Sequence, residues 1–142
     1  MKIGFTGTRD GMTARQISML RDMFILGRLK SKIEEFHHGL CVGSDEQAAE
    51  LVSTQFPDVR IVCHPPINRT FESRIVKPDW VVLPRMDYME RNHSIVDSCD
   101  ILVAAPDSYI EKLRSGTWST VRYANRVGRK TYIFYPFDPR MR

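Results

Sequence analysis

Short apolar runs alternate with amphipathic stretches along this chain, and that alternation constrains the fold more than any other feature. The clearest run is "DILVAAP" at residues 100–106, which is almost entirely apolar. Such sequences are typical of strands covered on both faces, and parallel neighbours need helical crossovers between them. The other stretches that we interpret as strands are residues 2–7, 36–43, 59–64 and 130–136.

Helical patterns fill the intervals between these strands. After Thr13, the residues Ile17, Leu20 and Phe24 recur at helical spacing. Thr13 is in the position of an N-cap, and Ser44 followed by Gln47 fits a capping box. Further helices are predicted at residues 44–56, at 86–99 with Met89, His93 and Val96 along one side, and at 115–128, ended by Gly128.

Four repeats of strand and helix predict a Rossmann-like three-layer α/β sandwich, with a mostly parallel sheet of about five strands and helices on both faces. The length of 142 residues suits a single domain over residues 1–142. A strand order of 3-2-1-4-5 would place the topological switch point between the first and fourth strands. Residues 66–85 form a long irregular stretch, which could act as a lid, an interface or a specificity element. Within it, Val81, Val82 and Leu83 suggest a short extra strand.

Composition limits the classes of function. Apolar residues are 42% and charged residues 27% of the chain, as in globular proteins, and no apolar run approaches a membrane span of about 20 residues. The first residues lack the apolar core of a signal peptide. Three cysteines, an odd number without CxxC spacing, indicate a reducing, cytoplasmic setting. The net charge of +4 permits anionic ligands but is too small to indicate nucleic acid.

Small and hydroxyl-bearing residues follow three of the strands. "TGTR" at residues 6–9 follows the first strand, "GSD" at 43–45 the second, and Arg114-Ser115-Gly116-Thr117 comes between the fourth strand and the next helix. Glycine lets backbone approach a ligand, and helix N-termini attract phosphates. We therefore predict a phosphate-facing wall at the carboxyl edge of the sheet, made of Thr6, Gly7, Thr8, Arg9, Gly43, Ser44, Ser115, Gly116 and Thr117.

Other residues are candidates for the same site. Arg9 and Arg114 would clamp a phosphate, with exposed surface arginines as the alternative. Trp118 would stack a base or ribose, although its spacing with Val121 and Ala124 favours the core. Arg91 and Asn92 begin the helix before the fourth strand and would face the cleft or solvent. Asp45 and Pro106 complete the predicted ligand-binding set. The four histidines and three cysteines show no zinc-type spacing, so we expect no metal site.

The motifs in their order resemble the SLOG superfamily of Rossmann-like proteins. They are "IGFTGTRDGMT", "GSDEQAAEL", "HPP", "RNHSIVDSCDILVAAP" and "RSGTWSTVRYA". That superfamily includes the LOG phosphoribohydrolases, DNA-processing protein A and small single-domain bacterial and phage proteins. The resemblance implies a site for a nucleotide or nucleotide-derived ligand, and homo-oligomers are an expectation.

The same resemblance separates binding from catalysis. In LOG enzymes a Gly-Thr segment holds phosphate, and glutamates just after it act with an upstream arginine. Gly116 and Thr117 match the Gly-Thr, and Arg91 matches the arginine, but Ser119 and Thr120 occupy the glutamate positions. Neither residue type supplies the carboxylate that a glycosidic bond needs. The leading hypothesis is therefore a nucleotide-binding module, with Glu90 and Arg91 as weak catalytic candidates.

Two alternatives remain at this stage. One is an N-glycoside hydrolase or phosphoribohydrolase that acts on a nucleoside monophosphate, with Glu90, Asp45 or Glu111 in the role of the missing glutamates. The other is a DNA-binding protein similar to DNA-processing protein A. We rank the second last, because no basic stripe interleaved with aromatic residues supports nucleic acid as a partner.

Overall fold

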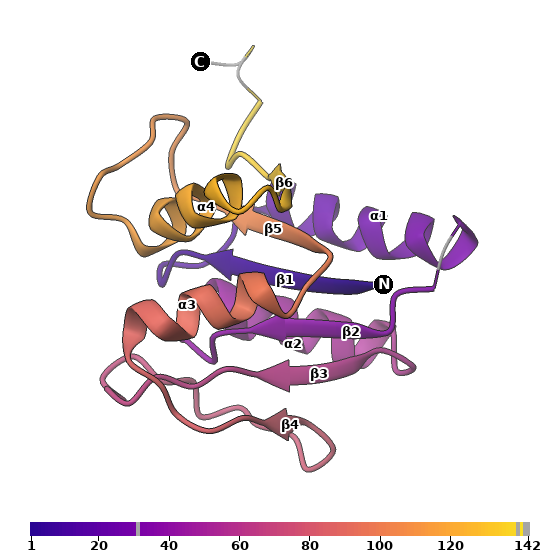
Figure 1. Cartoon of the computed structure of the whole chain (residues 1–142). Coiled ribbons are helices and arrows are strands. Elements are labelled where there is room, and N and C mark those ends of the chain that lie inside the picture. The colour runs from indigo at the N-terminus through magenta and orange to yellow at the C-terminus, as the bar shows by residue number, and fades with distance from the viewer. Residues whose placement is uncertain (31, 139, 141–142) are drawn as a thin grey trace.

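The computed structural model describes residues 1–30, 32–138 and 140, and it contains a three-layer α/β sandwich (Figure 1). Its strands all run parallel in one six-stranded sheet, in the order β4-β3-β2-β1-β5-β6. They are β1 (Lys2–Gly7), β2 (Glu35–His38), β3 (Arg60–Cys63), β4 (Val81–Val82), β5 (Ile101–Ala105) and β6 (Lys130–Ile133).

Two helices cover each face of this sheet. Figure 1 shows α3 and α4 in front of the strands and α1 and α2 behind them. The helices are α1 (Ala14–Lys30), α2 (Ser44–Gln55), α3 (Tyr88–Asp97) and α4 (Gly116–Arg126). The Rossmann-like fold class is therefore confirmed. The sheet has one strand more than expected, because the apolar pair in the long loop joins β3 as the edge strand β4.

Phenylalanine rings fill the space between the sheet and the rear helices. Phe24 of α1 lies 5.8 Å from Phe36 of β2 and 5.4 Å from Phe56, between ring centroids, and Phe5 of β1 lies 5.8 Å from Phe36. All four rings are buried. On the front face the core is smaller, and Trp118 packs there with Ala104 and Val121. The core interpretation of Trp118 is therefore correct.

The caps of the helices differ in how well the sequence predicted them. Thr13 Oγ1 accepts a hydrogen bond from Gln16 N at 3.3 Å, and Gln16 Oε1 accepts from Thr13 N at 3.0 Å, so α1 begins with a capping box. The capping box predicted for α2 is wrong. Gly43 is the N-cap residue there, and Ser44 caps nothing with its side chain. Gln47 instead accepts from Met12 N at 2.6 Å, because the chain after β1 packs against α2.

The second strand is shorter than predicted. It ends at His38, whereas we expected it to continue through residue 43. Leu40 has a positive φ of 57°, which turns the chain out of the sheet. Cys41 then forms an isolated antiparallel bridge with Glu72 of the long loop. This bridge ties the long loop to the carboxyl edge of the sheet, beside the site described next.

Candidate functional site

The topological switch point lies between β1 and β5, whose carboxyl ends are adjacent. In open α/β sheets ligands bind beyond the strands at such a point. The chain leaves β1 toward α1 on the rear face and leaves β5 toward α4 on the front face (Figure 1). The juxtaposition expected from the sequence is present, because Gly7 and Thr8 line the same pocket as Gly116 and Thr117.

Two adjoining pockets occupy this position. The first, which we call the polar pocket, has a volume of about 500 Å³ and is lined by Gly7, Thr8, Arg9, Asp10, Phe71, Tyr88, Asp107, Lys112, Arg114, Ser115, Gly116 and Thr117. The second, which we call the apolar pocket, has about 480 Å³ and is lined by Arg9, Cys41, Pro66, Asn68, Phe71, Tyr88, Met89, Asn92, Leu113, Arg114, Ser115, Gly116 and Ser119. The residues that line both pockets join them into one cleft.

The N-terminus of α4 forms one wall of the polar pocket. Ser115 is the N-cap of this helix, and its Oγ accepts a hydrogen bond from Trp118 N at 3.3 Å. The N–H groups of Gly116 and Thr117 come before the first intrahelical hydrogen bonds, so they remain available to an acceptor in the pocket. A Cβ added at Gly116 would lie 3.0 Å from Tyr88 Oη. Glycine at this position thus keeps the cleft open between α4 and α3.

Positive charge gathers around the polar pocket. The Arg9 guanidinium lies 3.7 Å above the centroid of the Phe71 ring, so the long loop holds it in place. Arg114 is exposed at the pocket beside Ser115. Lys112 is paired with Asp107 at 3.0 Å, which offsets its charge. The arrangement can hold an anion through two arginines and the end of a helix.

Arg91 is the least expected feature of the site, because only 2% of its surface is exposed. Its Nη1 donates to Gly39 O and to His64 O, the latter at 3.2 Å. Its Nε donates to Asn92 Oδ1 at 2.8 Å. The guanidinium therefore connects α3 to the ends of β2 and β3, and the solvated helix face that we considered is wrong for this residue.

The orientation of α3 follows from this buried arginine. The side of α3 that faces the sheet carries Arg91, Asn92, Ile95 and Val96, whereas Met89 is exposed. Our expectation that Met89 and His93 lie on the same side of the helix as Val96 is therefore wrong. Apolar periodicity misled us because an arginine and an asparagine occupy buried positions, which single-sequence patterns assign to apolar residues.

Asp45 lies behind the cleft, close to Arg91. Its Oδ2 accepts hydrogen bonds from Gly39 N and Cys41 N, each at 3.2 Å. A Cβ added at Gly39 would lie 2.5 Å from Arg91 Nη1 and 3.1 Å from Asp45 Oδ2. Burial raises the pKa of Asp45 to about 6, and the charge of Arg91 opposes that rise. Burial also raises the pKa of the neighbouring Cys41 thiol.

A small cavity of about 20 Å³ separates Asp45 from the cleft. Asp45, Arg91 and Asn92 line it together with backbone and side chains from β1 and α4. That volume is enough for about one water molecule. Asn92 also lines the apolar pocket above, so the buried pair lies directly beneath the cleft.

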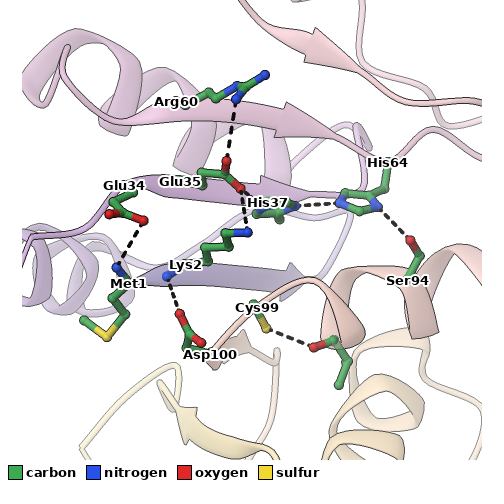
Figure 2. A network of polar contacts seen from close by, with 11 residues as sticks. Met1, Lys2, Glu34, Glu35, His37, Arg60, His64, Ser94, Cys99 and Asp100 are labelled. Carbon is green, nitrogen blue, oxygen red and sulfur yellow. Dashed lines mark hydrogen bonds and ion pairs between the residues drawn. The ribbon is translucent and has the colours of Figure 1, made fainter.

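A chain of hydrogen bonds connects β2, the end of β3 and α3 (Figure 2). Glu35 Oε1 lies 2.8 Å from His37 Nε2, His37 Nδ1 lies 2.7 Å from His64 Nε2, and His64 Nδ1 lies 3.2 Å from Ser94 Oγ. Burial lowers the pKa of His64 to about 4 and lowers that of His37. Both rings are neutral near pH 7. Within the described part of the chain, no three His, Cys, Asp or Glu residues are grouped to hold a metal ion.

Several residues that we predicted for the site do not line the two pockets of the cleft. Gly43 and Ser44 pack against the back of the loop after β1: a Cβ at Gly43 would lie 2.1 Å from Arg9 O, and Ser44 N donates to Thr8 O at 3.0 Å. Thr6 lines only the small cavity. Pro106 is buried, and its carbonyl accepts from Gln16 Nε2 at 2.7 Å. These positions do not themselves test ligand binding.

The acidic candidates are also distributed unevenly. Glu90 is exposed on α3, and Glu111 is paired with Arg122 at 3.0 Å. At the two positions of the LOG glutamates, Ser119 lines the apolar pocket, whereas the hydroxyl of Thr120 donates back to Gly116 O at 2.8 Å. Asp45 is therefore the only one of the three substitute carboxylates that lies beneath the cleft.

Sequence reasoning missed the residues that supply most of the apolar pocket. Phe71 and Asn68 come from the long loop, Tyr88 and Met89 from the first turn of α3, and Leu113 from the segment before α4. The length of the irregular stretch was a signal that it had a role, but no periodicity indicated which of its side chains face inward. Leu113, Met89 and Tyr88 are also largely exposed, and an apolar residue at a rim cannot be told from a core residue by pattern.

The fold and the cleft define a Rossmann-like α/β protein with a pocket at the switch point of its sheet. No family model and no curated protein matches the sequence. Among solved structures, the chain is similar to the molybdenum cofactor binding protein from the phototrophic bacterium Rippkaea orientalis. The identity is 20% and the TM-score 0.67, over 99% of this chain and 78% of that one.

A second similar structure is the X-ray structure of TM1055, a structural genomics target. Its identity to this chain is 19% and its TM-score 0.59, over 92% of this chain and 71% of that one. At such identities the similarity concerns the fold alone. Within the residues that the structure describes, no helix is long and apolar enough to cross a membrane.

Proposed function

We propose that this protein binds a phosphorylated small molecule of the nucleotide type in the cleft at the switch point. One observation carries the proposal: a polar pocket and an apolar pocket adjoin and share Arg9, Phe71, Tyr88, Arg114, Ser115 and Gly116. A nucleotide has the same two-part chemistry, because a charged phosphate and a flat heteroaromatic ring are joined by a sugar.

The phosphate would bind in the polar pocket. The free N–H groups at the start of α4 would donate to its oxygens, and Arg9 and Arg114 would balance its charge. The ring would enter the apolar pocket, which offers Phe71 and Tyr88 as aromatic surfaces and Met89 and Leu113 as aliphatic ones. The resemblance to the SLOG superfamily supports the same class of ligand, and membership of that superfamily is part of this proposal.

Calorimetric titration against a panel of ligands tests the proposal. The panel holds nucleoside monophosphates, cyclic nucleotides and ADP-ribose derivatives, together with molybdenum cofactor because a protein of similar fold is named for binding it. We expect at least one member to bind with micromolar affinity, and Arg9→Gln and Arg114→Gln each to weaken binding about tenfold. The exposed Arg74 lines neither pocket, so Arg74→Gln is the control. Folded protein that binds no member of the panel would refute the proposal.

Hydrolysis of an N-glycosidic bond is the second candidate function, and the position of Asp45 favours it. A water molecule that attacks the anomeric carbon of the sugar must lose a proton while the carbon–nitrogen bond breaks. The Asp45 carboxylate would accept that proton, and the leaving base would keep the bonding electrons and take a proton from solvent. A carboxyl group with a pKa of about 6 is suited to such a transfer near neutral pH.

Release of free base from a nucleoside monophosphate measures this activity. We expect Asp45→Asn to abolish it while binding persists, and the matched acid-to-amide change at the exposed Glu90, Glu90→Gln, to leave the rate unchanged. An Asp45→Asn variant that releases base at the wild-type rate would exclude this role for Asp45. Self-association and cytoplasmic localisation remain predictions, and analytical ultracentrifugation would measure the first.

A further inference from the structure

Asn92 has an unusual position among the residues of the cleft. It lies in the second turn of α3, only 9% of its surface is exposed, and yet it lines both the apolar pocket and the small cavity beneath it. The other residues of this helix that line the apolar pocket, Tyr88 and Met89, are exposed at its rim. Asn92 thus presents a polar side chain at the floor of the apolar pocket.

The orientation of the Asn92 amide is fixed by chemistry. Its Oδ1 lies 2.8 Å from Arg91 Nε. A guanidinium can only donate hydrogen bonds, so the amide atom that faces it must be the oxygen. Arg91 itself is held in place, because its Nη1 donates to Gly39 O and His64 O and its Nη2 donates to Cys41 Sγ. The NH₂ group of Asn92 is therefore held on the side away from Arg91.

This NH₂ group lacks an acceptor within the described part of the chain, since the hydrogen bond from Arg91 is the only one found for the Asn92 side chain. Asn92 Nδ2 is not among the buried side-chain atoms that lack a partner, so this nitrogen reaches the open space of the pocket. A donor in this position can bind water or an acceptor atom of a ligand. The pocket that Asn92 lines is where that acceptor would come from.

We propose that Asn92 is a specificity-determining residue that donates a hydrogen bond to an acceptor atom of the bound ligand, and that Arg91 fixes the amide in the donating orientation. This inference rests on the proposed function, because it concerns the same cleft. Asn92 lines the apolar pocket and not the polar one. The acceptor is thus an atom of the ring or of the sugar, such as a ring nitrogen, a carbonyl oxygen or a hydroxyl, and not a phosphate oxygen.

The isosteric change Asn92→Asp separates recognition from structure. Aspartate keeps the acceptor that Arg91 needs and strengthens that hydrogen bond with its charge. The melting temperature should therefore stay the same or rise. It also replaces the donor with a second acceptor. We expect the affinity for adenosine 5′-monophosphate to fall about 10- to 100-fold, measured by calorimetry.

Asn68→Asp is the matched control. Asn68 lines the same pocket and is also bound through its Oδ1, which accepts from Thr70 N at 3.0 Å, but it is exposed. The Asn68→Asp change adds the same negative charge to the same pocket, so it measures the general effect of that charge on an anionic ligand. We expect a loss of no more than about threefold from it, because solvent screens an exposed charge.

Ribose 5-phosphate identifies which part of the ligand carries the acceptor. If Asn92→Asp weakens its binding as much as that of adenosine 5′-monophosphate, the acceptor is on the sugar; if only the nucleotide is affected, it is on the ring. Equal affinities of wild type and Asn92→Asp for the nucleotide would overturn the inference alone. Wild-type protein that binds no member of the panel overturns the proposed function, and this inference with it. Should Asn92→Asp fail to fold, Asn92→Ser removes the amide donors without adding charge, and its affinity should fall at least threefold.

Discussion

The buried histidines predict a marked loss of stability in mild acid. His64 lies between His37 and Ser94 in Figure 2, and its pKa is lowered from 6.5 to about 4 because burial disfavours the charged ring. His38, which is fully buried between Leu40 N and Cys63 Sγ, has a pKa of about 3 for the same reason. The unfolded chain binds these protons more tightly than the folded protein does. The contribution of the neutral histidines to the free energy of unfolding is therefore fully present above pH 6.5 and is lost as the pH falls below that value.

The magnitude follows from these values. Between pH 7.5 and pH 5, the free energy of unfolding falls by about 2 kcal/mol for His64 and by about 2 kcal/mol for His38. Asp45 acts in the opposite direction, because its pKa is raised to about 6 in the folded protein. Proton uptake by Asp45 raises the free energy of unfolding by about 1 kcal/mol over the same interval. The net loss is thus about 3 kcal/mol, and His37, whose pKa is also lowered, adds to it.

Urea denaturation at the two pH values measures this loss, with His64→Gln as the informative variant. At pH 7.5 the variant should be about 1–2 kcal/mol less stable than wild type, because it loses hydrogen bonds to His37 and Ser94. Its further loss on going to pH 5 should be smaller by about 2 kcal/mol, since the titrating group is gone. His93→Gln, on the outer part of α3 against Tyr123, is the control. The reasoning is refuted if His64→Gln and wild type lose the same free energy between pH 7.5 and pH 5.

Two further predictions concern glycines. Gly43→Ala should lower the free energy of unfolding by more than about 2 kcal/mol in urea denaturation, because φ is +83° and the added Cβ would lie 2.1 Å from Arg9 O. Gly128→Ala, with φ +75° and open space around the Cβ, is the matched control and should lower the free energy of unfolding by only about 1 kcal/mol. Equal losses in the two variants would show that the packing of Gly43 is unimportant. Gly116→Val should weaken nucleotide binding about tenfold in calorimetry without unfolding the protein, since its side chain would meet the Tyr88 hydroxyl. Unchanged affinity would show that this part of the cleft is not used.

The sequence was informative where local rules decide the structure. The apolar run at 100–106 and its counterparts predicted a parallel sheet, and the order of its main strands followed from the topology of such folds. Ser115 caps α4 with its side chain, at a position directly before a helical pattern. The cap predicted at Ser44 is wrong, because the loop after β1 reaches the same helix terminus and the backbone carbonyl of Thr8 accepts from Ser44 N.

A cleft lies at the edge of the sheet where the sequence places the polar loops, and its lining includes residues that the sequence did not indicate. Strand ends converge by topology, so the juxtaposition of the loop after β1 with the start of α4 could be predicted from spacing. The apolar half could not be, because Phe71 reaches it from a loop without periodicity, held by contacts such as the bridge between Cys41 and Glu72 and the hydrogen bond from Val42 N to Phe71 O. Loops of this kind take their conformation from contacts distant in sequence, which a pattern search does not see.

By itself, the sequence determined the layers of this protein, the direction of its strands and the edge at which its polar loops meet, because hydrophobic periodicity and the chirality of crossovers act locally. Only the tertiary structure decided the chemistry at that edge. Arg91, Asn92 and Asp45 look like surface residues in the sequence, yet the packing of α3 and α2 against the sheet buries all three beneath the cleft. Burial depends on which neighbours exclude water, and that is a property of the assembled fold.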